Sequence, residues 1–235
     1  MAQTMEPVIN GIDLETFHVP TRTKEEVRYR IAEIGIIPAV RVGSEDDALF
    51  IAEALMEAGI PIVEISTAFP GAFHTISHLA KHLPNMIAGA GSIMSTETAR
   101  RCLDEGARFL TTDGLVPDVV ELAVKEEVVV FPGALTPTEI IAAWKAGSDF
   151  VKVVPCDAVG GHNYIRSLKS SMPQIHLIAA GGVDQRTALS FITAGATALG
   201  VGRDLIPAEA IRLRQAQRIQ ELGRRFLSSV DNGRK

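Results

Sequence analysis

The sequence contains few cysteines, no excess of basic side chains and no long apolar run, and each of these absences excludes a class of protein. Its 235 residues include two cysteines, Cys102 and Cys156, which lie far apart and lack the spacing of metal ligands. A scaffold held together by disulfides is therefore not expected. We predict instead that both residues are buried or partly buried thiols.

Charge and hydropathy argue against two further kinds of partner. The formal net charge is −5 at pH 7, so no basic excess is present to attract nucleic acid or anionic lipid. No stretch contains the ~18 uncharged apolar residues that a membrane span needs. Residues 1–26 also lack a basic region followed by an apolar one. We expect a cytoplasmic protein that binds small molecules and neither nucleic acid nor membrane.

The chain has the length at which α/β barrels occur as single domains. Residues 1–22 show no clear periodicity, whereas "TKEE" at 23–26 has the spacing of a capping box and apolar residues follow it at helical intervals. We predict an N-terminal extension and helix over residues 1–30, and one barrel domain over residues 31–235.

Short apolar runs alternate with amphipathic stretches through the rest of the chain. Helix starts are readable at "SEDD" (44–47), "STET" (95–98) and "TPTE" (136–139). Eight such units, joined by right-handed crossovers, predict a single-domain (β/α)8 TIM barrel with the extra N-terminal helix outside it, and an open doubly wound sheet is the alternative. The eight expected strands are residues 35–42, 60–66, 86–91, 107–113, 127–133, 149–154, 175–182 and 196–202.

A faint internal repeat gives side-chain directions within this barrel. The stretches "MEAG", "LDEG", "WKAG" and "ITAG" each end in a glycine suited to a left-handed helix cap, and an even-numbered strand follows each one. Counting five residues on from these glycines reaches Glu64, Thr111, Lys152 and Gly200. One interior layer of a barrel is built from alternate strands, so Glu64 and Lys152 are expected to face a shared interior.

Lys152 is the candidate nucleophile. A lysine in a covered barrel strand loses its hydration, which favours the neutral amine, and such an amine can condense with a ketone to form an iminium. Glu64 could then move the protons that the carbinolamine and carbon–carbon cleavage steps require. The alternatives are an exposed lysine at a strand edge, or one half of a plain buried ion pair with Glu64.

Two glycine loops are candidates for a phosphate site. Gly181 and Gly182 follow the seventh expected strand, where they allow close backbone approach to a ligand, and Asp184 can cap the next helix. Gly202 and Arg203 follow the eighth strand, and the loops after strands seven and eight are the usual phosphate site of such barrels. The alternative is that the glycines only allow tight packing.

Arg41 and Ser92 end the first and third expected strands. Arg41 could meet a substrate carboxylate and Ser92 could donate a hydroxyl, although a simple surface or capping role is the alternative for each residue.

Three histidines suggest a competing, metal-dependent chemistry. His74, His78 and His82 recur every four residues on one face of an expected helix, where they could ligate a divalent ion. This face lies outside the barrel, away from the strand ends that carry the other candidates, so solvated or interface histidines are the favoured interpretation and no metal site is predicted.

Six motifs in order give the chain a specific resemblance to a known family. They are "VEIS" around Glu64, "GAGSIMS" at 89–95, "FPGALTPTE" at 131–139, "FVKVVPCDAVGG" at 150–161, "AAGGV" at 179–183 and "GVGRDL" at 200–205. Over roughly residues 30 to 215 the sequence resembles the class I 2-keto-3-deoxy-6-phosphogluconate (KDPG) and 4-hydroxy-2-oxoglutarate (KHG) aldolases. The family is commonly trimeric, which implies a homotrimer.

The resemblance assigns roles to individual residues. It implies that Lys152 is the Schiff-base lysine, that Glu64 is the acid/base group, and that Ser92 stands where the family usually has a threonine contacting the pyruvate carboxylate. Several relatives place an arginine near the substrate where this chain has Arg41. The phosphate site maps onto the loops of Gly181, Gly182 and Gly202.

Three positions depart from the well-known bacterial KDPG enzymes. Ala68 replaces an arginine four residues beyond the glutamate, Ala180 replaces a threonine before the paired glycines, and Arg203 replaces a serine of the phosphate loop. These changes bear on substrate length, stereochemistry and phosphate dependence.

We therefore expect a lyase that uses no metal and no cofactor and cleaves KDPG, or a related 2-keto-4-hydroxy acid, to pyruvate and an aldehyde such as glyceraldehyde 3-phosphate. The alternatives are an aldolase for 4-hydroxy-2-oxoglutarate or 2-keto-3-deoxy-6-phosphogalactonate, or a barrel that binds phosphorylated ligands without catalysis.

Overall fold

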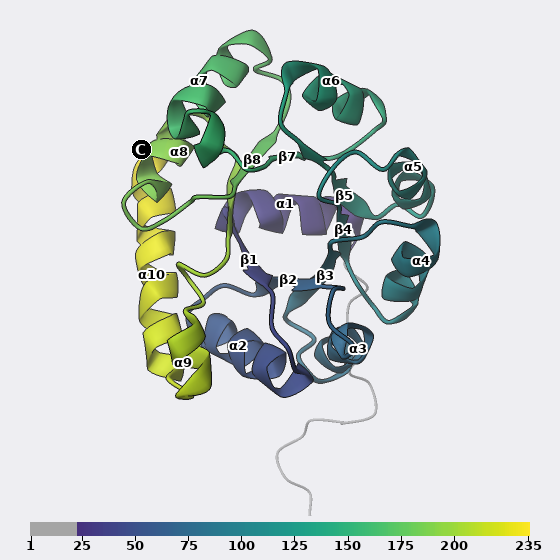
Figure 1. Cartoon of the computed structure of the whole chain (residues 1–235), viewed down its shortest axis with the longest axis vertical. Coiled ribbons are helices and arrows are strands. Elements are labelled where there is room, and N and C mark those ends of the chain that lie inside the picture. The colour runs from purple at the N-terminus through teal and green to yellow at the C-terminus, as the bar shows by residue number, and fades with distance from the viewer. Residues whose placement is uncertain (1–22) are drawn as a thin grey trace, which may run out of the picture.

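Parallel strands alternate with helices along residues 23–235, the part of the chain that the computed structural model describes (Figure 1). The expectation for residues 1–22 lies outside the described residues. The strands are β1 (Ile36–Val40), β2 (Ile62–Ser66), β3 (Ile87–Gly91), β4 (Phe109–Thr111), β5 (Val129–Phe131), β6 (Gly133–Ala134), β7 (Val151–Val153), β8 (Leu177–Ala180) and β9 (Ala198–Val201). The helices are α1 (Lys24–Ile34), α2 (Glu45–Glu57), α3 (Ala72–His82), α4 (Thr96–Asp104), α5 (Pro117–Lys125), α6 (Pro137–Lys145), α7 (Gly161–Ser171), α8 (Ala188–Thr193), α9 (Ala208–Arg212) and α10 (Ala216–Gly233).

The strands form a barrel, which confirms the predicted fold over the open sheet. They pair in parallel in the order β5-β4-β3-β2-β1-β9-β8-β7-β6. β5 and β6 are two parts of the fifth predicted strand, separated by Pro132, which has no backbone N–H to donate. β5 pairs with β4 and β6 pairs with β7, so the two ends of the sheet meet within one stretch of chain. All eight expected strands therefore occur, the fifth in two pieces.

Helix starts agree with the sequence signals. Thr23, Ser44, Ser95 and Thr136 each accept a hydrogen bond from a backbone N–H in the first turn of the helix that follows. At Thr23 and Thr136 the bond is reciprocated by a glutamate three residues on, which completes a capping box.

The repeat glycines end the helical turns in the left-handed conformation that favours glycine. Their φ angles are +87° at Gly59, +99° at Gly106, +97° at Gly147 and +101° at Gly195. The strands that follow these four turns are β2, β4, β7 and β9. The repeat predicted from the sequence is thus a repeat of backbone geometry.

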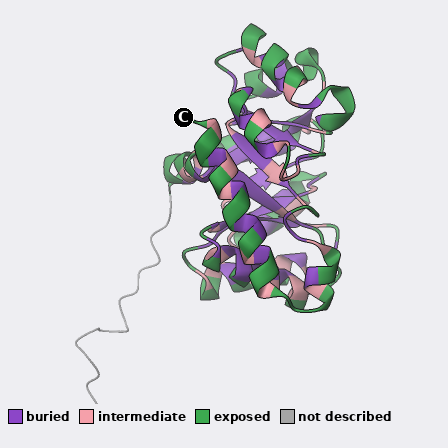
Figure 2. Cartoon of the chain, turned by 90° about the vertical axis from the view of Figure 1, so that its left-hand side faces the viewer, coloured by how far each residue is buried: buried purple, intermediate pink, exposed green. Residues whose placement is uncertain are grey.

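Helix α1 lies across the barrel at the end where the strands begin, and α10 runs along the outside (Figures 1 and 2). Lys24 Nζ of α1 lies 3.1 Å from Oδ2 of Asp149, which precedes β7. The same oxygen accepts a hydrogen bond from the Val130 N–H of β5 at 3.0 Å. Val27 and Ile31 are buried beneath the helix, so α1 is joined to the barrel by apolar packing and by one ion pair.

Burial follows the barrel architecture. Figure 2 shows buried residues concentrated along the strands and exposed residues on the outer faces of the helices. Cys102 and Cys156 are free and buried, as predicted, and burial raises the pKa of each thiol to about 12, which disfavours the reactive thiolate. Within residues 23–235, no helix has the length and apolar character that crossing a membrane would require.

Candidate active site

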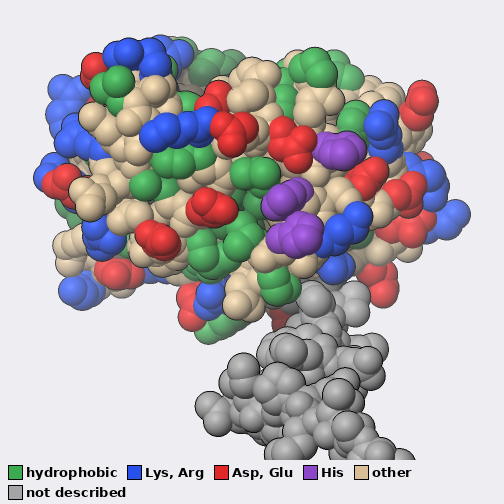
Figure 3. Space-filling model, turned by 90° about the horizontal axis from the view of Figure 1, so that it is seen from below, with side chains coloured by type: hydrophobic (Ala, Val, Ile, Leu, Met, Phe, Trp, Pro, Cys, Tyr) green, Lys and Arg blue, Asp and Glu red, His purple; other side chains and the backbone are tan. Residues whose placement is uncertain are grey.

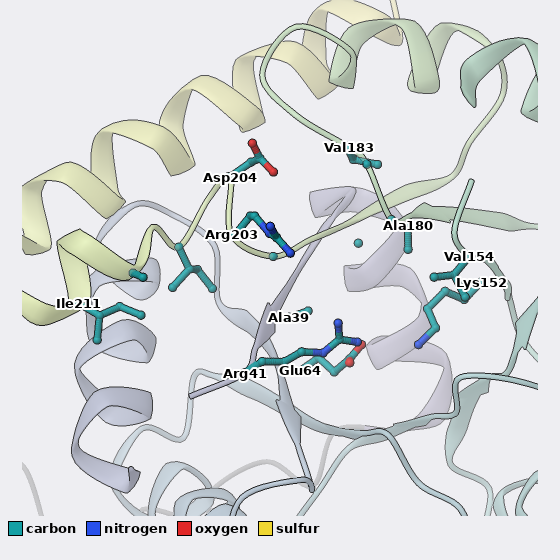
Figure 4. Close-up of a pocket in the computed structure, with 16 residues that line it drawn as sticks. Ala39, Arg41, Glu64, Lys152, Val154, Ala180, Val183, Arg203, Asp204 and Ile211 are labelled. Carbon is teal, nitrogen blue, oxygen red and sulfur yellow. The ribbon is translucent and has the colours of Figure 1, made fainter. Parts of the chain in front are cut away.

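A cavity of about 410 Å³ opens at the carboxyl ends of the strands (Figure 4). This is the end of a (β/α)8 barrel at which active sites lie. Charged side chains reach the cavity from β2, from β7 and from the loops after β1 and β9, and the glycines after β8 line it as well. The lining residues are Ala39, Arg41, Glu64, Lys152, Val154, Ala180, Gly181, Gly182, Val183, Gly200, Gly202, Arg203, Asp204, Ile206, Ala208 and Ile211.

Lys152 and Glu64 share this cavity, as the repeat predicts. Lys152 stands on β7 with its side chain only 5% exposed, and its ammonium points into the space where the Glu64 carboxylate also lies (Figure 4). Among the described residues, the ion-pair partner of Lys152 is Asp113, and Glu64 forms no ion pair. Both sequence alternatives for Lys152, an exposed edge lysine and a plain ion pair with Glu64, are therefore wrong.

The Glu64 carboxylate has space because the neighbouring strand carries a glycine. Glu64 pairs with Gly89 in the β2–β3 register, and Gly91 lies two residues further along β3. A Cβ added at Gly91 would stand 2.2 Å from Oε1 of Glu64. The absence of a side chain at this position gives the carboxylate its place at the cavity wall.

The other two repeat positions have different environments. Gly200 lines the cavity, where a Cβ would come within 2.9 Å of the Ala180 Cβ. Thr111 is fully buried and its Oγ1 donates a hydrogen bond to the Phe131 carbonyl at 3.0 Å. Thr111 therefore ties β4 to β5 and does not line the cavity.

Asp113 is a site residue that sequence reasoning missed. Its Oδ1 lies 3.5 Å from Lys152 Nζ and 3.8 Å from Nη2 of Arg41, and its side chain is 50% exposed. A usable signal exists in the repeat, because two residues beyond Thr111 is the next position on the same strand face. The equivalent positions just after β7 and β9 are Val154 and Gly202, which both line the cavity, whereas the equivalent position in β2, Ser66, does not.

The paired glycines after β8 have a packing reason as well as a place in the cavity. Gly181 and Gly182 have φ angles of +77° and +90°. A Cβ at Gly181 would lie 2.8 Å from Pro155 Cα, and a Cβ at Gly182 would lie 2.1 Å from Asp157 Cβ. The loop after β7 thus presses against these glycines, so tight packing, the alternative to a ligand role, explains their identity by itself.

The loop after β9 presents a cation over the cavity. Arg203 extends from this loop toward the space that Arg41 and Glu64 border (Figure 4), while Gly202 has nothing within 4 Å of an added Cβ. The Gly202 carbonyl accepts hydrogen bonds from the N–H groups of Leu205 and Ile206 at 3.0 and 2.9 Å. A small open backbone position and a guanidinium therefore stand side by side at the cavity wall.

Asp184 organises the turn that leads into α8, whereas the N-cap residue of the helix is Thr187, which makes no side-chain cap hydrogen bond. Its Oδ1 accepts hydrogen bonds from the backbone N–H groups of Arg186 and Thr187 at 2.8 and 2.9 Å, just before α8. Hydrogen bonds from the Arg186 side chain, and then from Thr187, lower the pKa of this carboxyl to about 2. The group therefore organises the loop beside the phosphate-site candidates.

Ser92 is not among the described residues that line the cavity. It has a left-handed backbone with φ +59°, and its hydroxyl accepts a hydrogen bond from the Ser66 hydroxyl at 3.4 Å. Of the two single candidates at strand ends, the structure brings Arg41 into the cavity and leaves Ser92 at the end of β3 in contact with β2.

The histidine stripe does not form a metal site. His74, His78 and His82 are exposed on α3 and line a surface pocket. Figure 3 shows histidine side chains gathered on one part of the surface, among charged side chains. The rings of His78 and His82 lie 4.5 Å apart, and His74 Nδ1 lies 3.8 Å from a Glu45 carboxylate oxygen. Residues 23–235 contain no group of three histidine, cysteine or acidic side chains placed to hold a metal ion. The described residues therefore offer the metal-dependent alternative no set of three ligands at this stripe.

The fold and the cavity together define a class of protein, a (β/α)8-barrel enzyme with a buried lysine and glutamate at the carboxyl ends of its strands. The particular family follows from comparison with known proteins. The family model described as KDPG and KHG aldolase matches residues 27–222, so the chain belongs to this aldolase family, and the resemblance drawn from its motifs is confirmed.

Individual relatives agree with this assignment. A 2-dehydro-3-deoxy-phosphogluconate aldolase of Haemophilus influenzae is 28% identical over 161 residues, which are 68% of this chain and 76% of the relative. A probable 2-dehydro-3-deoxy-6-phosphogalactonate aldolase of Rhizobium meliloti is 29% identical over 72% of this chain and 81% of its own. The KDPG aldolase of Legionella pneumophila, solved with pyruvate captured as a covalent carbinolamine, has a TM-score of 0.78 and 25% identity over 84% of this chain and 96% of that one.

Proposed function

We propose that this protein is a Schiff-base-forming class I aldolase that cleaves a 2-keto-4-hydroxy acid into pyruvate and an aldehyde. The observation that carries the proposal is the pairing of a buried amine, Lys152, with a carboxylate, Glu64, in one cavity at the catalytic end of the barrel. The carbinolamine captured in the Legionella relative supports it, since that species is the first covalent product of an amine with a keto acid.

The first half of the reaction belongs to Lys152. The neutral amine attacks the C2 ketone of the substrate, forming a C–N bond and a carbinolamine. Glu64 donates the proton with which the C2 hydroxyl leaves as water, and an iminium remains. Lys152 is suited to this step because its side chain is only 5% exposed and it lines the cavity that also holds Glu64.

The second half uses Glu64 as a base. Its carboxylate, directly or through one water, accepts the proton of the C4 hydroxyl as the C3–C4 bond breaks. The electron pair of that bond passes into the iminium, so the aldehyde leaves and an enamine stays on Lys152. Protonation of the enamine at C3 and hydrolysis of the C–N bond then release pyruvate and the free amine.

Substrate binding follows from the cations around the cavity. We assign the C1 carboxylate to Arg41, and a terminal phosphate to Arg203 with the open backbone at Gly202, because these groups line the cavity. Ser92 stays a further candidate for the carboxylate, because its hydroxyl stands at the end of β3. These groups favour a phosphorylated 2-keto-3-deoxy acid, and KDPG would yield glyceraldehyde 3-phosphate.

A second substrate has a specific observation in its favour. The Rhizobium relative carries the name of a probable 2-dehydro-3-deoxy-6-phosphogalactonate aldolase and is as similar to this chain as the Haemophilus KDPG enzyme. The two substrates differ in configuration at C4, the carbon whose hydroxyl faces the base. Turnover of the two compounds in parallel decides between them.

The reaction as proposed draws its electron sink from the Lys152 iminium and its proton transfers from Glu64, so we assign it neither a metal nor a cofactor. Full activity after treatment with EDTA is the expected result. We also propose a homotrimer, on the basis of the resemblance to a commonly trimeric family. Light scattering coupled to size-exclusion chromatography tests this, and a monomeric mass would contradict it.

Borohydride trapping tests the Schiff base. Reduction in the presence of pyruvate should leave a covalent adduct on the peptide that contains Lys152, seen by mass spectrometry, and Lys152→Arg should abolish both adduct and turnover. Lys145→Arg, at the end of α6, is the matched control and should be trapped like the parent. Folded parent protein that gives no adduct would overturn the Schiff base, and pyruvate binding without turnover of any keto acid would favour a non-catalytic barrel.

A further inference from the structure

One carboxylate oxygen lies close to both the amine and the guanidinium that the proposed reaction uses first. Asp113 Oδ1 lies 3.5 Å from the amine of Lys152 and 3.8 Å from the guanidinium of Arg41. Asp113 follows β4, whereas its two partners come from β7 and from the end of β1. Three strand ends on different sides of the barrel are thus joined through a single oxygen.

The position of this oxygen matches that of a substrate group. In a 2-keto acid the C1 carboxylate is bonded to C2, which is the atom that Lys152 attacks in the proposed function. Once the C2–Nζ bond has formed, a carboxylate oxygen lies within hydrogen-bonding distance of Nζ. The proposed partner of that carboxylate is Arg41. A 2-keto acid therefore needs, for its own carboxylate, the place between Lys152 and Arg41 that Asp113 Oδ1 holds.

Asp113 can give up this place by moving its side chain alone. The backbone is packed against β6, because a Cβ on Gly133 would come within 2.3 Å of the Asp113 carbonyl oxygen. The side chain, in contrast, is 50% exposed. A half-exposed carboxylate that turns outward enters water, so its displacement does not leave a buried unpaired charge.

We propose that Asp113 is an internal stand-in for the substrate carboxylate. It holds Arg41 and the Lys152 amine in place while the site is empty, and the carboxylate of the arriving 2-keto acid displaces it. The proposal rests on the proposed function for the identity of the ligand. If so, Asp113 opposes the binding of a 2-keto acid, both because it occupies the position of the substrate carboxylate and because it repels another anion.

The sign of this effect separates the proposal from a simple positioning role. If Asp113 only positioned Lys152, neutralising Asp113 would weaken the binding of every ketone to the lysine. If it competes with a carboxylate, neutralisation tightens the binding of keto acids and leaves ketones without a carboxylate unchanged. Two other anions border the site, Glu64 and Asp204, but neither pairs with Arg41 or Lys152 among the described contacts.

Calorimetric titration of the full chain with pyruvate, and separately with hydroxyacetone, tests the proposal. Hydroxyacetone is a ketone of similar size that has no carboxylate. In Asp113→Asn the Kd for pyruvate should fall by about threefold or more, the scale of one exposed charge interaction, with no change for hydroxyacetone. Asp231→Asn, an exposed position on α10 outside the cavity, carries the same change in net charge and should bind both ligands like the parent.

The other outcomes have distinct meanings. A pyruvate Kd that is unchanged or raised in Asp113→Asn, or a parallel shift for both ligands, would overturn the stand-in role. Borohydride trapping of the parent protein tests the proposed function independently of the Asp113 variant. Parent protein that binds pyruvate but is not trapped at Lys152 would refute the proposed function, while tighter binding of pyruvate alone by Asp113→Asn would still support the exchange of carboxylates.

Discussion

The carboxylate of Glu64 lies against Gly91 of the adjacent strand, so closely that a Cβ on Gly91 would stand 2.2 Å from Oε1. The proposed base, Glu64, therefore has room for its carboxylate because Gly91 has no side chain. This relationship gives the first of four predictions.

Gly91→Ala should impair catalysis by displacing Glu64. Because a shift of about 1 Å in a reacting group can cost about a hundredfold in rate, we expect kcat to fall tenfold to a hundredfold. Glu64→Gln, which removes the base outright, should lose at least as much. Gly43→Ala, where an added Cβ meets nothing within 4 Å, is the control and should turn over normally. Parental kcat in Gly91→Ala would contradict the placement of Glu64.

Arg203→Ala should separate phosphorylated from unphosphorylated substrates. A charge-assisted hydrogen bond is worth about 1.5–3 kcal/mol, so KM for KDPG should rise by about tenfold or more. KM for unphosphorylated 2-keto-3-deoxygluconate should hardly change. Arg212→Ala, on the exposed side of α9, controls for the loss of one positive charge. An equal loss on both substrates would show that Arg203 does not bind phosphate.

Asp149→Ala should destabilise the attachment of α1 to the barrel. Asp149 is 8% exposed and accepts from Lys24 Nζ at 3.1 Å and from the Val130 N–H at 3.0 Å. Leaving the buried Val130 N–H and the partly buried Lys24 ammonium without this acceptor should lower the free energy of unfolding by about 2–3 kcal/mol, measured in urea. Arg30→Met breaks an exposed ion pair with Glu33 and should cost less than about 1 kcal/mol. Equal losses of unfolding free energy in the two variants would show that Asp149 stabilises the fold no more than an exposed ion pair does.

Asp184 should make stability depend on acid pH. Its pKa is lowered from 3.8 to about 2 in the folded protein, chiefly by the Arg186 side chain. A depressed carboxyl pKa stabilises the fold above the unfolded pKa, and that contribution is lost as pH falls through the folded pKa. The difference in Tm between the parent and Asp184→Asn should therefore be constant above pH 4 and shrink between pH 4 and pH 2. A difference that stays the same at pH 2 would contradict the hydrogen bonds that lower this pKa.

The parts of the structure that the sequence predicts are those set by local physics. Helix starts follow from caps such as Thr23 and Thr136, whose side chains bond within their own turn. The direction of Lys152 follows from a glycine that fixes the preceding turn and from the two-residue period of a strand. Both signals need only a few neighbouring residues.

The parts that were not predicted depend on contacts between distant segments. The break of the fifth strand at Pro132 shows only when the partners on both sides are known. Asp113 is the last residue of the fourth expected strand, and its contacts with Lys152 and Arg41 become visible only when β4, β7 and β1 are brought together. Ser92 is a hydroxyl at a strand end in the sequence, but its left-handed backbone is set by the turn after β3.

The break at Pro132 has a consequence for how activity arises during folding. The strands from β5 to β1 carry Glu64 and Asp113, while those from β9 to β6 carry Lys152, and the Lys152 N–H donates to the Pro132 carbonyl at 2.9 Å. The amine is thus anchored at the seam between two half-sheets, and its carboxylates belong to the other half. A chain in which both half-sheets have formed but have not yet joined would have native-like secondary structure without an assembled site. The recovery of turnover during refolding would therefore report when the barrel closes.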